Sequence, residues 1–192
     1  GRIGPVREAY KRLLFRRGSY VRLREVLAEE AGREHDRGRS VRLLSEAARI
    51  SLDRLGEVPP AIELLRQAAS RTGVDPLLDS MVLSELGELQ QQAGDFKAAA
   101  ETLRMALTLE SDPMMRAYEH RRLAEVFEAE EAWDEAISSL KASLEDEPLH
   151  VGAQLALERL LVLRERHEER LALWLDEAAH AREPQRRAAA FV

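Results

Sequence analysis

The stretch DPLLDSMVLSELGELQQQAGDFKAAAETLRMALTLESDP, residues 75–113, reads as two helices joined by a tight turn. Asp75 is placed to cap the first helix, and Pro76 follows at the first helical position, where its missing N–H costs nothing. Gly94 can take the positive φ that ends a helix, and Asp95 is placed to cap the next one.

Apolar and small residues recur in both halves of this stretch at three- and four-residue spacing, which indicates helices rather than strands. They are Leu83, Leu86, Gly87 and the alkyl part of Gln90, then Phe96, Ala99, Leu103, Ala106 and Leu107. Because Gly87 and Ala99 are small, two antiparallel helices can approach closely there. The stretch is therefore predicted to fold as a helical hairpin.

The same landmarks recur along the chain, which predicts a helical repeat. Acid–proline pairs mark unit boundaries at Asp75-Pro76, Asp112-Pro113, Glu147-Pro148 and Glu183-Pro184. A turn followed by a large residue recurs at Gly18-Ser19-Tyr20, Gly56-Glu57-Val58, Gly94-Asp95-Phe96 and Glu131-Ala132-Trp133. The inward positions of the second helices are predicted to be Leu23, Ala61, Ala99, Ala136 and Leu171, and one turn later Leu27, Leu65, Leu103, Leu140 and Leu175.

These landmarks predict one elongated domain over residues 1–192, since stacked repeats share a continuous core. Its hairpins are predicted at about 5–37, 38–75, 76–112, 113–147 and 148–183, with the start of a further helix at 184–192. The sequence lacks an initial methionine and stops inside that helix, so we expect a piece of a longer protein. Its excess of arginine over lysine and its lack of asparagine suggest a GC-rich, bacterial genome.

The repeat pattern resembles the tetratricopeptide repeat (TPR) family over roughly residues 5–184. The family pattern is matched best by Leu83, Leu86, Gly87, Phe96, Ala99, Leu103, Ala106 and Pro113, and then by Leu123, Ala124, Phe127, Trp133, Ala136, Leu140 and Pro148. The repeat is slightly longer than the family's, and Gln90 stands where an aromatic residue is usual. The resemblance implies an all-α, right-handed superhelical solenoid of about five antiparallel hairpins, whose first helices line a concave binding face.

Charge is unevenly distributed along a chain with a net charge of −6. Residues 1–42 hold 12 basic and 6 acidic side chains, whereas the remainder holds 17 basic and 29 acidic ones. One interpretation is that the basic first hairpin is a docking patch for an acidic partner, a phosphate or a membrane surface. The other is that its arginines only keep the surface soluble.

No pattern in the sequence indicates catalysis, a metal site or a cofactor. The histidines form no H-E-x-x-H motif, and no phosphate-binding loop or G-x-S-x-G elbow is present. The cluster His167-Glu168-Glu169 is interpreted as a solvated charge run, and Glu145-Asp146-Glu147 as caps for the helix after Pro148. Without cysteine there is no thiolate chemistry. No run of about 18 apolar residues occurs, so no membrane span is predicted.

A partner protein is predicted to bind the first-helix positions that face away from the hairpin partner. These are Arg42, Ser45 and Arg49, then Met81, Ser84, Glu88 and Gln91, and finally Tyr118, Arg121, Glu125 and Glu128. Tyr118 and Arg121 are the preferred pair, because tyrosine and arginine are enriched among residues that dominate binding energy. The alternative is that Tyr118 packs between hairpins and Arg121 pairs with Glu125 one helical turn on.

The sequence thus predicts a non-catalytic scaffold that binds a peptide or helix of another protein. The alternative is a structural subunit that self-associates through its open C-terminal end, as part of a larger bacterial machine for motility, pili or secretion. RNA binding is disfavoured, because the acidic balance after residue 42 repels phosphates. The resemblance also suggests the clamp by which some TPR domains hold acidic chaperone tails, but that clamp uses asparagines, and this chain has none.

Overall fold

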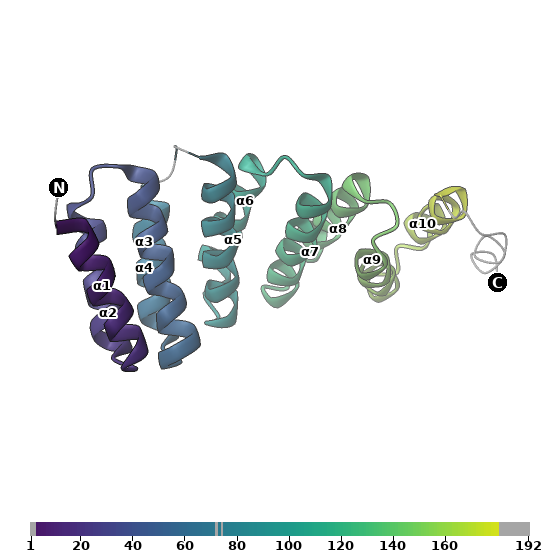
Figure 1. Ribbon diagram of the computed structural model, residues 1–192. Coiled ribbons are helices and arrows are strands. Elements are labelled where there is room, and N and C mark those ends of the chain that lie inside the picture. Colours follow the sequence, from purple (N-terminus) through teal and green to yellow (C-terminus); the bar gives the residue numbers. More distant parts are fainter. Residues whose placement is uncertain (1–2, 72, 74, 181–192) are drawn as a thin grey trace. The chain divides into compact units, whose positions relative to one another are not determined.

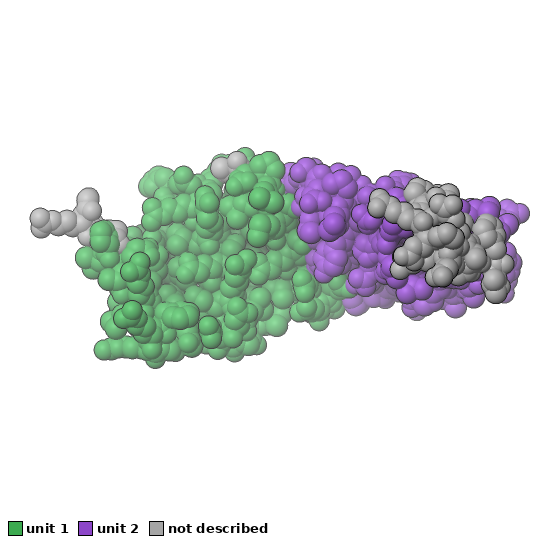
Figure 2. All heavy atoms as spheres, turned by 45° about the vertical axis from the view of Figure 1, so that its right-hand side comes forward, with its two compact units in different colours: residues 1–95 green, residues 96–192 purple. Residues whose placement is uncertain are grey.

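The computed structural model describes residues 3–71, 73 and 75–180, and every regular element in these ranges is helical (Figure 1). The predicted all-α class is therefore confirmed. The chain divides into two compact units, residues 1–95 and residues 96–192 (Figure 2). Each unit is described by itself, and the single domain over 1–192 stays a prediction.

Unit 1 is a run of helices in which each packs against the next along the chain. Its elements are α1 (Ile3–Arg16), α2 (Tyr20–Arg33), α3 (Arg37–Ile50), the π-helical turn η1 (Ser51–Leu55), α4 (Val58–Ala69) and α5 (Pro76–Gln92). Its core is built from one stripe of each helix and includes Leu14, Leu23, Leu27, Val41, Leu44, Ala47, Ala61 and Leu65.

Unit 2 continues the same pattern of sequential packing. Its elements are α6 (Phe96–Leu109), α7 (Pro113–Ala129), α8 (Trp133–Asp146), α9 (Val151–Leu163) and α10 (His167–His180). Its core includes Ala99, Leu103, Ala124, Phe127, Ala136, Leu140, Leu157 and Leu160. Because α5 belongs to unit 1 and α6 to unit 2, the close approach of Gly87 to Ala99 stays a prediction.

Aspartate caps and prolines start the helices as the sequence predicts. The Asp75 side chain accepts hydrogen bonds from the backbone N–H groups of Leu77 and Leu78, at 3.2 and 3.4 Å. The Asp112 side chain accepts one from the backbone N–H of Met114, at 2.9 Å. In both helices proline occupies the first helical position.

Each hairpin turn has one residue with positive φ, which lets the chain reverse directly after a helix. Three of these residues are glycines, Gly18, Gly56 and Gly94, with φ of 68°, 67° and 79°. The other two are Glu131 and Glu165, with φ of 58° and 55°. The last turn has no glycine and was not recognised in the sequence.

The turn at Glu165 corrects the predicted register of α10. Counted from their turn residues, the inward Ala136 of α8 corresponds to Arg170 of α10, not to Leu171. Leu171 and Leu175 are accordingly 54% and 50% exposed, so their prediction as inward positions is wrong. Arg170 is half-buried, with its guanidinium 4.2 Å from the centre of the Trp174 ring.

A second correction concerns the start of α9. Pro148 was predicted to open this helix, with acidic caps just before it, but α9 begins at Val151. The cap is His150, whose Nδ1 accepts a hydrogen bond from the backbone N–H of Ala153 at 3.1 Å. Asp146 instead accepts hydrogen bonds from the Arg116 guanidinium, with Nε at 3.1 Å. The pair Glu183-Pro184 and the helix predicted from residue 184 lie outside the described residues.

Candidate functional site

The structure distributes the predicted binding residues over two units. Arg42, Ser45 and Arg49 lie on α3, and Met81, Ser84, Glu88 and Gln91 lie on α5, so these belong to unit 1. Tyr118, Arg121, Glu125 and Glu128 lie together on α7 of unit 2. The two groups are considered separately, and a single groove formed by both stays a prediction.

In unit 2, three of the four predicted residues line a groove between α7 and α9. Its volume is about 290 Å³, and its lining includes Arg121, Glu125, Glu128, Leu155, Ala156 and Arg159. The Arg121 guanidinium donates to the Glu125 carboxylate along α7, and the Arg159 guanidinium donates from α9 to Glu128. Two ion pairs thus flank a floor with aliphatic side chains.

The structure gives the contacts of Tyr118 and Arg121 within unit 2, and their binding of a partner stays a prediction. Arg121 does pair with Glu125 within α7. Tyr118 is 45% exposed, so nearly half of its surface stays accessible to a partner. Its ring lies 5.7 Å from the Arg122 guanidinium carbon, which holds the ring by a cation–π contact.

Sequence reasoning missed the contribution of α9. Counted from the turn residues Glu131 and Glu165, the α7 positions Tyr118, Arg121, Glu125 and Glu128 correspond to Gly152, Leu155, Arg159 and Val162. Leu155 and Val162 are 64% and 47% exposed. The spacing would have revealed these positions if the glycine-free turn had been recognised.

Gly152 shapes the groove because it has no side chain. A Cβ atom at this position would lie 3.3 Å from Arg121 Nε and 3.2 Å from His150 Cε1. Such a contact is tighter than normal packing, so glycine leaves room for the Arg121 side chain between α7 and α9. The position of Arg121 therefore depends on a residue in the next hairpin.

In unit 1, the predicted α3 residues lie beside a second hollow. Its volume is about 230 Å³, and it is lined by residues of α1, α2 and α3, including Glu46. Arg42 and Arg49 are exposed and lie one helical turn from Glu46 on either side. Burial raises the pKa of Glu46, and the charge of nearby Lys11 opposes that rise. The α1 residues of this hollow were not among the predicted binding residues.

The π-helical turn η1 shifts the register of α3 relative to that of α5. A π turn adds one residue to an α-helix and shifts everything before it by one position. Arg42, Ser45 and Arg49 accordingly lie one residue further from Gly56 than Met81, Ser84 and Glu88 lie from Gly94.

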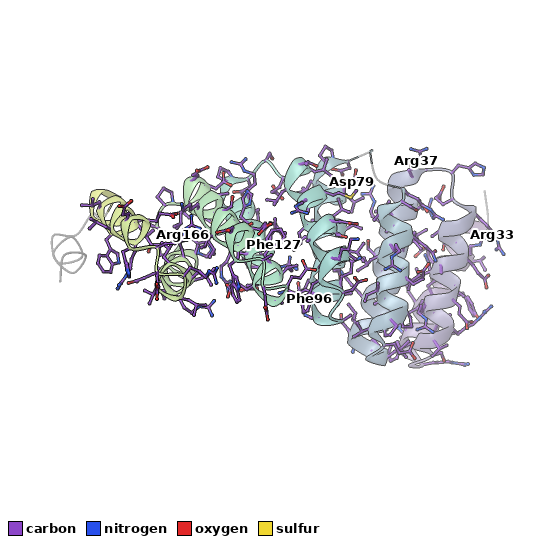
Figure 3. The ribbon with its side chains drawn as sticks, turned by 180° about the vertical axis from the view of Figure 1, so that it is seen from behind. Arg33, Arg37, Asp79, Phe96, Phe127 and Arg166 are labelled. Carbon is purple, nitrogen blue, oxygen red and sulfur yellow. The ribbon has the colours of Figure 1, made fainter. Side chains whose placement is uncertain are left out.

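Within the cluster at residues 167–169, His167 and Glu168 are exposed, whereas Glu169 forms ion pairs at the surface. Glu169 accepts hydrogen bonds from Lys141 Nζ at 2.5 Å and from Arg166. Arg166, which is labelled in Figure 3, also donates to Asp134 at 2.8 Å. The hydrogen bond from Lys141 lowers the pKa of Glu169. These pairs border a cleft of about 480 Å³ between α8, α9 and α10, with an apolar floor that includes Leu144, Leu157 and Leu173.

Two further searches bear on the classes of function. Among residues 3–71, 73 and 75–180, no three histidine or acidic side chains come together in a way that could hold a metal ion. Within the same ranges, no helix has both the length and the apolar character needed to cross a bilayer.

Comparison with known proteins confirms the predicted resemblance. The tetratricopeptide repeat family matches residues 82–113, which lie within the stretch quoted first. A search of curated proteins finds no match. Folds of this family serve in general as protein-interaction scaffolds and are generally non-catalytic.

Solved structures confirm a TPR-like solenoid fold. MamA from Desulfovibrio magneticus RS-1 matches with a TM-score of 0.62 and 16% identity, covering 91% of this chain and 93% of that one. A TPR protein from Parabacteroides merdae matches with a TM-score of 0.66 and 16% identity, covering 100% and 73%. A kinesin light chain protein from Podospora anserina matches with a TM-score of 0.60 and 18% identity, covering 93% and 97%. At these identities the likeness concerns the fold alone.

Proposed function

Because residues 82–113 form a tetratricopeptide repeat, we propose that the chain is a non-catalytic scaffold whose α7–α9 groove binds a peptide or helix of a partner protein. The observation that carries the proposal is the groove itself. In it the predicted residues Arg121, Glu125 and Glu128 meet the exposed Leu155 of the next hairpin.

The chemistry of the groove favours a segment with mixed side chains. Leu155 offers an apolar contact inside the groove, and Tyr118, one helical turn before Arg121 on α7 and outside the lining, offers an aromatic ring of the kind that often anchors interfaces. Arg121 and Arg159 are already paired with carboxylates, so a partner gains little by binding them as isolated charges. It gains more by burying aliphatic groups between the two ion pairs. This removes apolar surface from water and places the ion pairs in a medium of lower dielectric constant.

The test is affinity capture with two matched baits. In the groove variant, Tyr118→Ala and Leu155→Ala remove two exposed apolar side chains of unit 2. In the control, Met105→Ala and Leu109→Ala remove two exposed apolar side chains from α6 of the same unit. We expect the wild type and the control to capture the same protein and the groove variant to lose it, provided that all three melt at the same temperature.

Affinity for the identified partner gives the quantitative readout. Truncation of two central interface residues costs on the order of 2–4 kcal/mol, so calorimetry of the purified pair should show affinity falling by more than about tenfold. Equal capture by the groove variant and the control would place the site elsewhere.

A second candidate function is self-association, and the exposure of Leu171 and Leu175 favours it. These leucines lie one turn apart on α10 and present a continuous apolar strip. A further repeat or a second copy of the chain would bury it. This candidate does not compete with the first for the same residues.

A further inference from the structure

The acidic side chains of the first 42 residues are all engaged within unit 1. Glu8 and Glu30 bind Lys11 at 2.7 and 3.0 Å. Three more form ion pairs: Glu25 with Arg22 at 2.9 Å, Glu29 with Arg22 and Arg33 at 3.7 Å, and Glu34 with Arg39 at 3.2 Å. Asp36 accepts a hydrogen bond from the backbone N–H of Arg39 at 2.7 Å. The surplus positive charge of this segment is therefore carried by the arginines that form no ion pair.

Part of that surplus lines the hollow of unit 1. Arg12 and Arg16 lie one turn apart on α1, both exposed, and neither forms an ion pair with any residue that the structure describes. Arg42 lies one helical turn before the lining residue Glu46 on α3. It is also exposed and forms no ion pair within the residues that the structure describes. Two unpaired arginines thus line the hollow, and a third lies one helical turn from its lining residue Glu46.

An aromatic pair adds an apolar contact beside these cations. Phe15 lines the hollow, is 46% exposed and packs edge-to-face on Tyr20 with the ring centres 5.8 Å apart. The guanidinium of Arg54 covers both rings, at 5.4 and 5.7 Å from their centres. The hollow therefore combines two unpaired arginines with an exposed aromatic surface.

From this arrangement we propose that the α1–α3 hollow of unit 1 binds an acidic, partly aliphatic segment of a partner protein. Arg12 and Arg16 would each donate paired N–H···O bonds to a carboxylate, and Phe15 would contact an aliphatic side chain between them. The inference rests on the proposed scaffold function and adds a second docking surface, together with the chemistry of its ligand.

Shape and charge favour a peptide over the other anionic partners. The arginines line a concavity, which a flat bilayer surface does not enter. Glu8 and Glu46 also line it, and they would repel the closely spaced phosphates of a nucleic acid. A peptide can set its carboxylates against the arginines and keep apolar side chains beside the two glutamates.

The probe is a fluorescein-labelled peptide of glutamate and leucine residues, followed by fluorescence anisotropy at low salt. The hollow variant carries Arg12→Gln and Arg16→Gln. The control carries Arg33→Gln and Arg37→Gln, which remove the same charge at the α2–α3 connection (Figure 3). We expect binding to weaken by at least about tenfold in the hollow variant and by less than about threefold in the control.

A gain-of-function variant gives an independent readout that does not depend on removing a contact. Glu46→Gln takes a carboxylate out of the hollow and should tighten binding of the peptide by about two- to fivefold. The matched change at an exposed glutamate of α6, Glu101→Gln, should tighten it less. Circular dichroism checks that each variant keeps the wild-type helix content.

Several outcomes would overturn the proposal. One is that the peptide does not bind at low salt, and another is that the hollow variant and the control weaken it equally, which would indicate net charge alone. Phosphatidylserine vesicles and single-stranded polyuridine serve as parallel probes. Binding of either that is lost in the hollow variant, without peptide binding, would assign the surface to that ligand. None of these results changes capture through Tyr118 and Leu155, so the two proposals fail separately.

Discussion

Two glutamates hold a backbone conformation that three glycines hold elsewhere in the same chain. Glu131 and Glu165 have φ near +55° at hairpin turns, where Gly18, Gly56 and Gly94 occupy the corresponding positions. For a residue with a Cβ this region costs roughly 1–2 kcal/mol, whereas glycine enters it freely. Both glutamates therefore carry local strain that the packing of the flanking helices must offset.

We expect Glu131→Gly to stabilise the protein by about 0.5–1 kcal/mol, because relief of strain exceeds the added flexibility of the unfolded chain. The adjacent Glu130 has φ of −90° and is exposed, so Glu130→Gly should instead be destabilising by a similar amount. Chemical denaturation of the two variants gives opposite shifts in midpoint if the turn geometry is correct. Shifts of the same sign would contradict it.

At the scale of the helices, small residues set how closely neighbours approach. In unit 2, Ala136 of α8 and Ala124 of α7 are both fully buried in the same core. Protein interiors are close-packed, so three extra heavy atoms at such a position have no space to occupy. The alanines are therefore as important to the hairpin as the leucines.

Ala136→Leu is expected to cost on the order of 1–3 kcal/mol by overpacking, and Ala99→Leu, at an equally buried position in the same unit, should behave alike. The control is Ala129→Leu at the exposed end of α7, which should leave the melting temperature nearly unchanged. Thermal unfolding of the three variants checks the register. An unchanged melting temperature in both buried variants would show that these alanines do not set the helix spacing.

At the scale of the whole molecule, the exposed leucines of α10 bear on assembly. We expect the weight-average mass in analytical ultracentrifugation to rise with concentration, because pairing of Leu171 and Leu175 with another copy removes apolar surface from water. Leu171→Gln with Leu175→Gln should abolish the rise. The control pair Met105→Gln with Leu109→Gln, on exposed positions of α6, should preserve it.

A mass that stays constant over the accessible concentrations would exclude self-association through this strip. The capture experiment on the α7–α9 groove would be unaffected, since its residues lie on α7 and α9. The assembly hypothesis and the groove hypothesis can thus be judged independently.

The sequence by itself determined the helices, their order and the repeat. Those features follow from short-range rules: acid–proline pairs start helices, glycine permits positive φ, and apolar spacing marks the buried stripe. The predicted inward residues Leu23, Ala61, Ala99, Ala136 and their partners one turn later are buried in the structure as far as α8. The rules failed at Glu147-Pro148, after which α9 begins only at Val151, and at Glu165, where neither a glycine nor a following large apolar residue marks the turn.

Only the tertiary structure decided which side chains come together to form the groove and the hollow. The α7–α9 groove joins side chains from two hairpins. Its shape depends on the absence of a side chain at Gly152, which leaves room for Arg121. The charge of the unit 1 hollow depends on which arginines stay unpaired once the carboxylates of residues 1–42 are engaged. Spacing along one helix carries no information about contacts between hairpins, because the depth and charge of a surface depend on residues far apart in the sequence.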